Sequence, residues 1–202
     1  MVRIEGLKKE YIDRVLPLMG QTRAAVFGIE SPLLVRAICR DAFADRRVNF
    51  LVASEEGMIV GYVIAVIDRG SYRKKFLMRH PVPGLYAVAA GIIKKILPKD
   101  KKSLDRKTGM PDGVSAGNSG RNWKDSGPST AKIINIGVSG AHRKRGVGKA
   151  LYKELFAVLK NKGVKRVDAN IDYGNMPSVR LHLSAGWKVE KRDSNLFASI
   201  DI

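Results

Sequence analysis

A short basic turn with two glycines constrains this chain more than any other feature. Its sequence is RKRGVGKAL at residues 143–151, between an apolar run at residues 133–138 and a helix-forming run at residues 150–160. The first N–H groups of a helix have no partner within the helix and carry partial positive charge. Gly146 and Gly148 have no Cβ, so the backbone can approach a phosphate closely. This strand–turn–helix pattern predicts a phosphorylated ligand, and an ordinary strand–helix connection is the alternative.

Two common phosphate-binding motifs do not fit this turn. A P-loop requires glycine five positions before a Gly-Lys pair and Ser or Thr after it, but here these positions hold Arg143 and Ala150. A dinucleotide-binding fingerprint requires a third glycine where Leu151 stands. The pattern that remains has an arginine and two glycines, at positions 143, 146 and 148.

A second motif, NMPSVRLHLSAGW at residues 175–187, follows a predicted strand at residues 166–171. Together the two motifs resemble Arg/Gln-x-x-Gly-x-Gly/Ala and Asn-x-x-Ala-hydrophobic-x-Leu-Tyr-x-x-x-Gly-Phe of the GNAT acetyltransferase superfamily. The resemblance covers residues 132–191 well and the N-terminal half in outline. It implies one α/β domain over residues 1–202, with a mixed, mostly antiparallel central sheet flanked by helices. It also implies transfer of an acetyl group from acetyl-CoA to a primary amine by direct attack in a ternary complex.

The resemblance further implies a site for acetyl-CoA as co-substrate, in the half at residues 131–202, and no metal. Loop amides would hold the pyrophosphate, and a strand that splays from its neighbour would bind the pantetheine arm. Asn175 would bind the pantetheine or orient the strand end, and a plain N-cap role is compatible with this. The residues expected to bind the cofactor are Ile136, Val138, Arg143, Lys144, Arg145, Gly146, Gly148, Lys149 and Asn175.

His182 stands at the motif position of the tyrosine to which the family assigns protonation of the leaving thiolate, so the resemblance makes it the candidate catalytic residue. An imidazole has an unperturbed pKa near 6.5 and can supply a proton. The alternative is a core histidine on the apolar face that Val179 and Leu183 share.

No motif identifies the general base. Many family members carry a carboxylate on the strand before the phosphate turn, but this strand offers only Lys132 and Asn135. Asp172, Glu30 and a chain of waters are candidates without a geometric argument. An acceptor of low pKa, a non-amine acceptor and a base supplied from an insertion at residues 69–130 also remain open.

The charge of the chain indicates anionic partners. The formal net charge is +18, and residues 69–130 hold 14 lysines and arginines against 4 aspartates. Such a field favours coenzyme A, nucleic acid, acidic lipid or a phosphorylated acceptor. Aromatic residues make up only 7% of the chain, and no aromatic-interleaved basic strand is evident, so nucleic acid is the less favoured partner. The acceptor is expected to be a small-molecule or peptide amine, and the positive charge of residues 69–130 favours an anionic one. The two alternative functions are a coenzyme A-binding module without turnover and a basic nucleic-acid-binding protein.

The expected elements follow the GNAT order, which is strand–helix–helix–strand–strand and then, from residue 132, strand–helix–strand–helix–strand. Strands are predicted at residues 2–5, 48–53 and 58–67, and helices at residues 7–19 and 31–43. An insertion at residues 69–130 comprises two short basic helices, at 72–80 and 84–97, and a long mobile loop at 99–130. This insertion could cap the core, form a lid over the acceptor, or give weak membrane-surface contact through residues 71–98.

The sequence also predicts a cytoplasmic protein. It contains one cysteine, Cys39, which suits a reducing compartment and is expected to be a buried small hydrophobe. The N-terminal residues enter strand-like alternation directly, and no apolar run reaches the roughly 18–20 residues of a membrane span. The sequence does not predict the oligomeric state.

Overall fold

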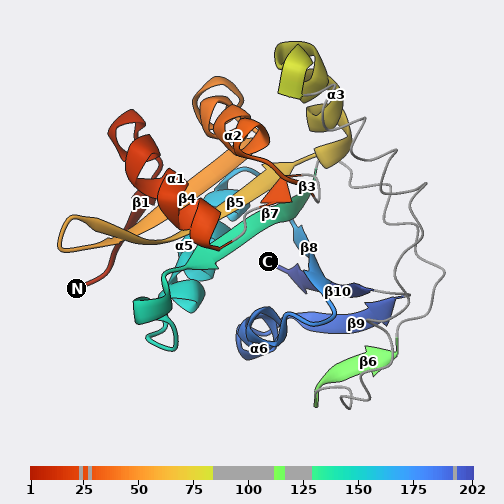
Figure 1. The fold of residues 1–202 in the computed structure, drawn as a ribbon. Helices are drawn as coiled ribbons and strands as arrows, with labels where there is room; N and C mark the ends of the chain where they lie inside the picture. Colours follow the sequence, from red (N-terminus) through yellow and green to blue (C-terminus); the bar gives the residue numbers. More distant parts are fainter. Residues whose placement is uncertain (23–24, 27–28, 84–111, 117–128, 193–194) are drawn as a thin grey trace.

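A central eight-stranded sheet organises the computed structural model, which describes residues 1–22, 25–26, 29–83, 112–116, 129–192 and 195–202 (Figure 1). Its strand order is β1-β4-β5-β7-β8-β10-β9-β6, and a small separate sheet pairs β2 with β3. The strands are β1 (Arg3–Gly6), β2 (Ala25–Val26), β3 (Ile29–Glu30), β4 (Val48–Glu55), β5 (Met58–Ile67), β6 (Val114–Ala116), β7 (Thr130–Val138), β8 (Arg166–Asp172), β9 (Lys188–Arg192) and β10 (Asn195–Asp201). The helices are α1 (Ile12–Gln21), α2 (Pro32–Ala44), α3 (Arg69–Arg79), α5 (Val147–Asn161) and α6 (Met176–Ser184), with short 3-10 turns η1 (Lys9–Tyr11) and η3 (Gly140–His142).

The sheet is mixed and mostly antiparallel, as predicted. Only the pairs β7–β8 and β6–β9 are parallel, and the other neighbours in the sheet run antiparallel. The N-terminal strands form a continuous antiparallel block, whereas β8, β10, β9 and β6 curve away from it (Figure 1).

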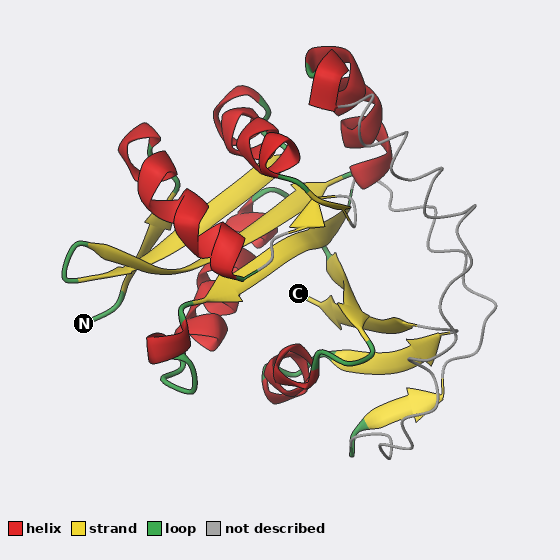
Figure 2. Cartoon of the chain, viewed as in Figure 1, coloured by secondary structure: helices red, strands yellow, loops and turns green. Residues whose placement is uncertain are grey.

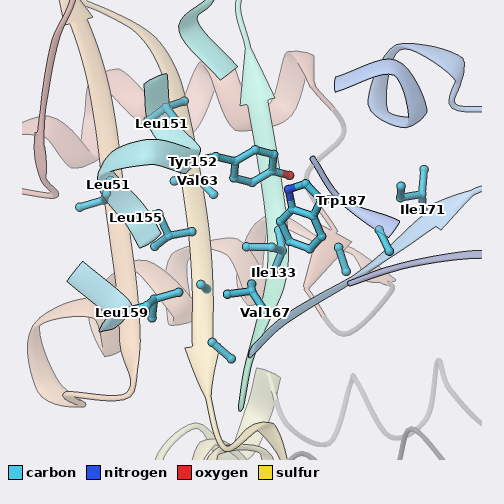
Figure 3. Packing of buried hydrophobic residues seen from close by; sticks show 14 of the residues in the cluster. Leu51, Val63, Ile133, Leu151, Tyr152, Leu155, Leu159, Val167, Ile171 and Trp187 are labelled. Atoms are coloured by element: carbon cyan, nitrogen blue, oxygen red, sulfur yellow. The ribbon is translucent and has the colours of Figure 1, made fainter. Parts of the chain in front are cut away.

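Helices cover both faces of the sheet, which places two hydrophobic cores in one domain (Figure 2). Apolar residues of α1, α2 and α3 pack on one face, including Leu34, Ile38 and Phe76. On the other face α5 presents residues at helical spacing to the strands (Figure 3). The large residues of α5 in this core are Val147, Leu151, Tyr152, Leu155 and Leu159. The α5 stripe follows the i, i+4 and i+8 pattern of a helix that is buried on one side.

Several boundaries and connections differ from the predictions. Helix α1 begins at Ile12 instead of residue 7, because Lys9–Tyr11 forms a 3-10 turn first. The predicted final strand is a hairpin of two strands, β9 and β10, in which Val189 pairs with Ala198. The predicted loop at residues 99–130 contains a short strand, β6, which pairs in parallel with β9.

The first part of the predicted insertion is a helix anchored to the core. Asp41 of α2 is fully buried and receives hydrogen bonds from the Tyr72 hydroxyl (2.9 Å) and from Arg79 Nη1 (2.7 Å) of α3. His80 Nε2 lies 2.9 Å from the same carboxylate. The predicted helix at 84–97 and most of the predicted loop lie outside the described residues. In the described part of the chain, no helix is both long and apolar enough to cross a membrane.

Candidate functional site

The neighbouring strands β7 and β8 separate after a short paired stretch. Their parallel pairing covers Thr130↔Arg166, Ala131↔Val167 and Lys132↔Asp168, and it stops there. β7 remains paired with β5 on its other side as far as Val138. Beyond Lys132, no described strand pairs with the edge of β7 that faces β8. The Val138 carbonyl accepts a hydrogen bond from Arg143 Nε at 3.3 Å. Figure 1 shows β8 diverging from β7 toward α6.

A cleft of about 740 Å³ lies along this part of β7, between the start of α5 and α6. Thr22 at the end of α1 also lines it, together with Pro177, Ser178, Arg180, Leu181 and Ser184. No aspartate or glutamate is among the described residues that line the cleft. The predicted cofactor-binding residues that the structure brings together here are Ile136, Val138, Arg143, Lys144, Gly146, Gly148, Lys149 and Asn175.

The basic turn has the geometry of an anion-binding helix start. Gly146 is the N-cap residue of α5 and has a left-handed backbone with φ +82°. The first bond of the helix runs from the Ala150 N–H to the Gly146 carbonyl, at 3.0 Å. The amides of residues 147–149 therefore precede the bonded part of the helix, at the end where its dipole is positive. Lys144 also has a positive φ, of +61°, so the turn is tightly curled at two positions.

The structure places Arg145 outside the cleft lining. Its Nη2 lies 3.1 Å from Glu55 Oε1, while His142 Nε2 lies 3.2 Å from Glu55 Oε2. Glu55 ends β4 and thus ties the β4–β5 hairpin to the turn before α5. Sequence reasoning missed Glu55 and His142, because an ion pair that spans 90 positions leaves no local signal.

Gly137 is a second position where the site needs glycine. A Cβ added there would lie 2.5 Å from Tyr62 Cε1 and 2.7 Å from Thr22 Oγ1. The Tyr62 hydroxyl lies 2.7 Å from Thr22 Oγ1 and donates to Asn135 Oδ1 at 2.6 Å. This chain of polar side chains joins α1, β5 and β7 behind the cleft. Gly137 lets the β7 backbone lie directly against it.

We expect the Gly137→Ala variant to be destabilised by about 1–3 kcal/mol, because a new methyl group forces its neighbours apart in a packed region. Urea unfolding measures this free energy. Gly6→Ala is the matched control, since Gly6 is also in a strand but has nothing within 4 Å of an added Cβ. Equal stabilities of the two variants would contradict the expectation.

Asn175 caps α6 and lies at the cleft. Its side-chain oxygen accepts the Ser178 N–H at 3.2 Å, which caps α6, and the residue also lines the cleft.

His182 does not line the cleft. It is 2% exposed and lies in the core among Tyr152, Trp187 and Val179 (Tyr152 and Trp187 are labelled in Figure 3). Its Nδ1 lies 2.7 Å from the Ser178 carbonyl, so this nitrogen carries the proton, and Nε2 accepts from the Tyr152 hydroxyl at 2.9 Å. Burial lowers the pKa of His182 to about 4, against a smaller opposing effect of the Ser178 hydrogen bond. The structure thus favours the core-histidine interpretation over proton donation to a ligand in the cleft.

The fold and the cleft define the class of this protein: an α/β domain whose splayed strand edge ends at a basic helix start. Residues 112–187 match a family model described as "Acetyltransferase (GNAT) family", which includes both sequence motifs. Residues 112–187 are thus similar to this acetyltransferase family, and the whole chain shares its fold with solved N-acetyltransferase structures. No curated protein sequence matches the chain.

Solved structures of low sequence identity share the fold over the whole chain. An N-acetyltransferase from Staphylococcus aureus Mu50 is 16% identical, with 100% of this chain and 98% of that chain covered and a TM-score of 0.60. The PaiA N-acetyltransferase from Thermoplasma acidophilum, in complex with coenzyme A, is 12% identical, with 100% and 99% covered and a TM-score of 0.59. The ribosomal-protein-S18-alanine N-acetyltransferase from Escherichia coli is 14% identical, with 100% and 94% covered and a TM-score of 0.55. At these identities the likeness establishes the fold.

Proposed function

We propose that this chain is an N-acetyltransferase that moves an acetyl group from acetyl-CoA to a primary amine by direct attack in a ternary complex. The observation that carries the proposal is the cleft of about 740 Å³ along the unpaired edge of β7, which ends at the start of α5. A long ligand with a phosphorylated end matches this shape. The structure of the PaiA enzyme with coenzyme A supports the choice of ligand.

The residues of the cleft fit the two ends of such a ligand. The helix-start amides at residues 147–149 and the side chains of Arg143, Lys144, Lys149 and Arg180 would bind the phosphates. The backbone of residues 136–138 would bind the amide-bearing arm, as an added strand does at an open sheet edge. The glycine at position 137 keeps this edge close to the polar side chains behind it.

Direct transfer is favoured over an acetylated cysteine intermediate. Cys39 is the only cysteine, and it is fully buried in α2 on the face opposite α5. Burial raises the pKa of its thiol to about 12, so the reactive thiolate is scarce at neutral pH. An uncharged amine held beside the thioester can instead attack it directly.

The acceptor is proposed to be a small-molecule or peptide amine. Preference for an anionic acceptor stays a prediction, because it depends on the charge of the insertion, most of which lies outside the described residues. A coenzyme A-binding module without turnover is the alternative function that the same cleft supports, since it has the phosphate site and no carboxylate base among its described lining residues.

Release of free thiol from acetyl-CoA tests this function. We expect turnover with at least one amine from a panel of a peptide with a free N-terminus, L-lysine, spermidine and glucosamine, followed with a thiol reagent and confirmed by the mass of the product. Binding of acetyl-CoA without thiol release across the panel would support the non-catalytic module. Absence of binding would contradict both functions.

A further inference from the structure

Lys132 lies at the vertex where β7 and β8 separate. It is the last residue of β7 that pairs with β8, opposite Asp168, and it is 8% exposed. Its Nζ donates a hydrogen bond to Asn170 Oδ1 at 3.0 Å. Asn170 lies two residues beyond Asp168 on β8, past the end of the pairing. The side chain of Lys132 therefore reaches from the closed part of the strand pair toward the open part.

The position of the cleft points a bound thioester toward this lysine. The phosphate-binding turn lies beyond one end of β7, and the cleft follows the strand back along Val138, Gly137 and Ile136. From Ile136, the last β7 residue that lines the cleft in this direction, to Lys132 the strand rises about a further 13 Å at 3.3 Å per residue. A pantetheine arm that starts at the phosphate-binding turn and lies along this edge of β7 brings its sulfur end toward the point where β7 and β8 separate.

We propose that Lys132 is a catalytic residue of the acetyl transfer: its Nζ gives a proton to the departing sulfur and receives the proton that the acceptor nitrogen loses. This role rests on the proposed function of the cleft. The role gives β7, which has no carboxylate, a side chain that transfers protons. Lys132 takes the place of His182 as the candidate proton donor, because His182 is buried in the core.

The proposed step balances without a further reactant. A bond forms between the amine nitrogen and the carbonyl carbon, and the bond from that carbon to sulfur breaks with its electron pair on sulfur. The sulfur takes a proton from the charged Nζ. The nitrogen, now acylated, returns its extra proton to the neutral Nζ, so Lys132 regains its starting form.

The surroundings of Lys132 suit this exchange. Burial, and to a smaller extent the charge of nearby Arg69 of α3, lowers the pKa of its amine to about 8, while Asp168 of β8 opposes this. Asp168 is itself bonded by Arg166 Nε at 2.8 Å, which tempers its effect. A free thiol has a pKa near 8.5, so proton exchange between the lysine and sulfur is nearly balanced in energy.

The competing role for Lys132 is a purely structural bridge to Asn170. The chain contains a second lysine, Lys162, whose amine likewise bonds an asparagine side chain on another element. Lys162 follows the end of α5, and its Nζ donates to Asn49 Oδ1 at 2.6 Å. Burial lowers the pKa of Lys162 as well. The 15 residues of α5 separate it from the phosphate-binding turn.

The test compares Lys132→Met, Lys132→Arg and Lys162→Met with the wild type. For each protein we would measure thermal stability, the Kd for acetyl-CoA, and kcat for the most active amine of the panel between pH 6 and pH 10. We expect kcat of Lys132→Met to fall by about 10²-fold, the usual contribution of a proton-transferring side chain, with little change in Kd. Lys132→Arg should stay as slow, because a guanidinium keeps its proton. Lys162→Met should match the wild type.

The pH profile provides a readout that a structural bridge would not change. Wild-type kcat should fall as pH rises through about 8, where burial holds the pKa of Lys132, since the proton to be given to sulfur is lost. This descending limb should be absent from the residual activity of Lys132→Met. An active Lys132→Met, recovery of kcat in Lys132→Arg, or an unchanged limb would overturn the role of Lys132 alone. A wild type that releases no thiol with any amine would overturn the proposed function and this role together.

Discussion

The Gly146→Glu variant should fold and yet lose all thermal stabilisation by acetyl-CoA. Gly146 caps α5 with φ +82°, and nothing lies within 4 Å of an added Cβ, so a side chain there extends into open space beside the helix start. Its carboxylate would occupy the place of a phosphate at the positive end of the helix. Ligand at 100 times its Kd stabilises a protein by about 2.7 kcal/mol. For a domain of this size, about 2–4 °C per kcal/mol gives a wild-type Tm shift of roughly 5–10 °C.

The chain offers a matched control for this variant at the other end of the same helix. Gly163 has φ +75° and, like Gly146, has nothing within 4 Å of an added Cβ. Gly163→Glu therefore introduces the same charge into the same backbone strain, away from the cleft. Differential scanning fluorimetry with and without acetyl-CoA should show the full shift for Gly163→Glu and none for Gly146→Glu. A full Tm shift in both variants would show that the phosphate of acetyl-CoA does not bind at the N-terminus of α5.

The parts of the site that the sequence predicted are those whose chemistry is local. The turn at residues 143–149 is one strand–helix connection, so its glycines and cations predict an anion site without knowledge of the rest of the fold. Asn175 caps α6 from three positions away, which is also a local pattern. The order of strands and helices could be predicted for the same reason, from periodicity and turn residues.

The parts that could not be predicted depend on contacts between distant segments. Glu55 meets Arg145 across 90 positions, and Lys132 meets Asn170 across 38. The residue at which β7 and β8 stop pairing depends on how the two strands align, and no sequence motif indicates it. His182 occupies the right motif position, but Tyr152 and Trp187 decide which way its ring faces. The strand β6 was not predicted, because the polar, glycine-containing sequence around it resembles a loop. It forms a strand by pairing with β9, which is distant in the sequence.

Burial of His182 makes the stability of the fold depend on pH. In the unfolded chain its imidazole binds a proton below a pH of about 6.5. In the folded chain burial lowers the pKa to about 4. The unfolded state therefore binds more protons between these values, and stability falls as the pH is lowered through the window. A shift of this size corresponds to about 3 kcal/mol, with the contribution fully present above pH 6.5 and lost by pH 4.

Urea unfolding at pH 7 and pH 4 measures this dependence, and His182→Gln isolates the histidine from the carboxylates that titrate in both proteins. The variant should be less stable at pH 7, because the amide fits the bonds to Tyr152 and Ser178 less well. Its stability should decline less on acidification, so the gap to the wild type should narrow by about 3 kcal/mol at pH 4. If the free energies of unfolding of the wild type and His182→Gln fell equally between pH 7 and pH 4, the imidazole would be accessible and would titrate near its ordinary pKa. In that case His182 would again be a candidate proton donor, and its burial against Trp187 would not describe the protein in solution.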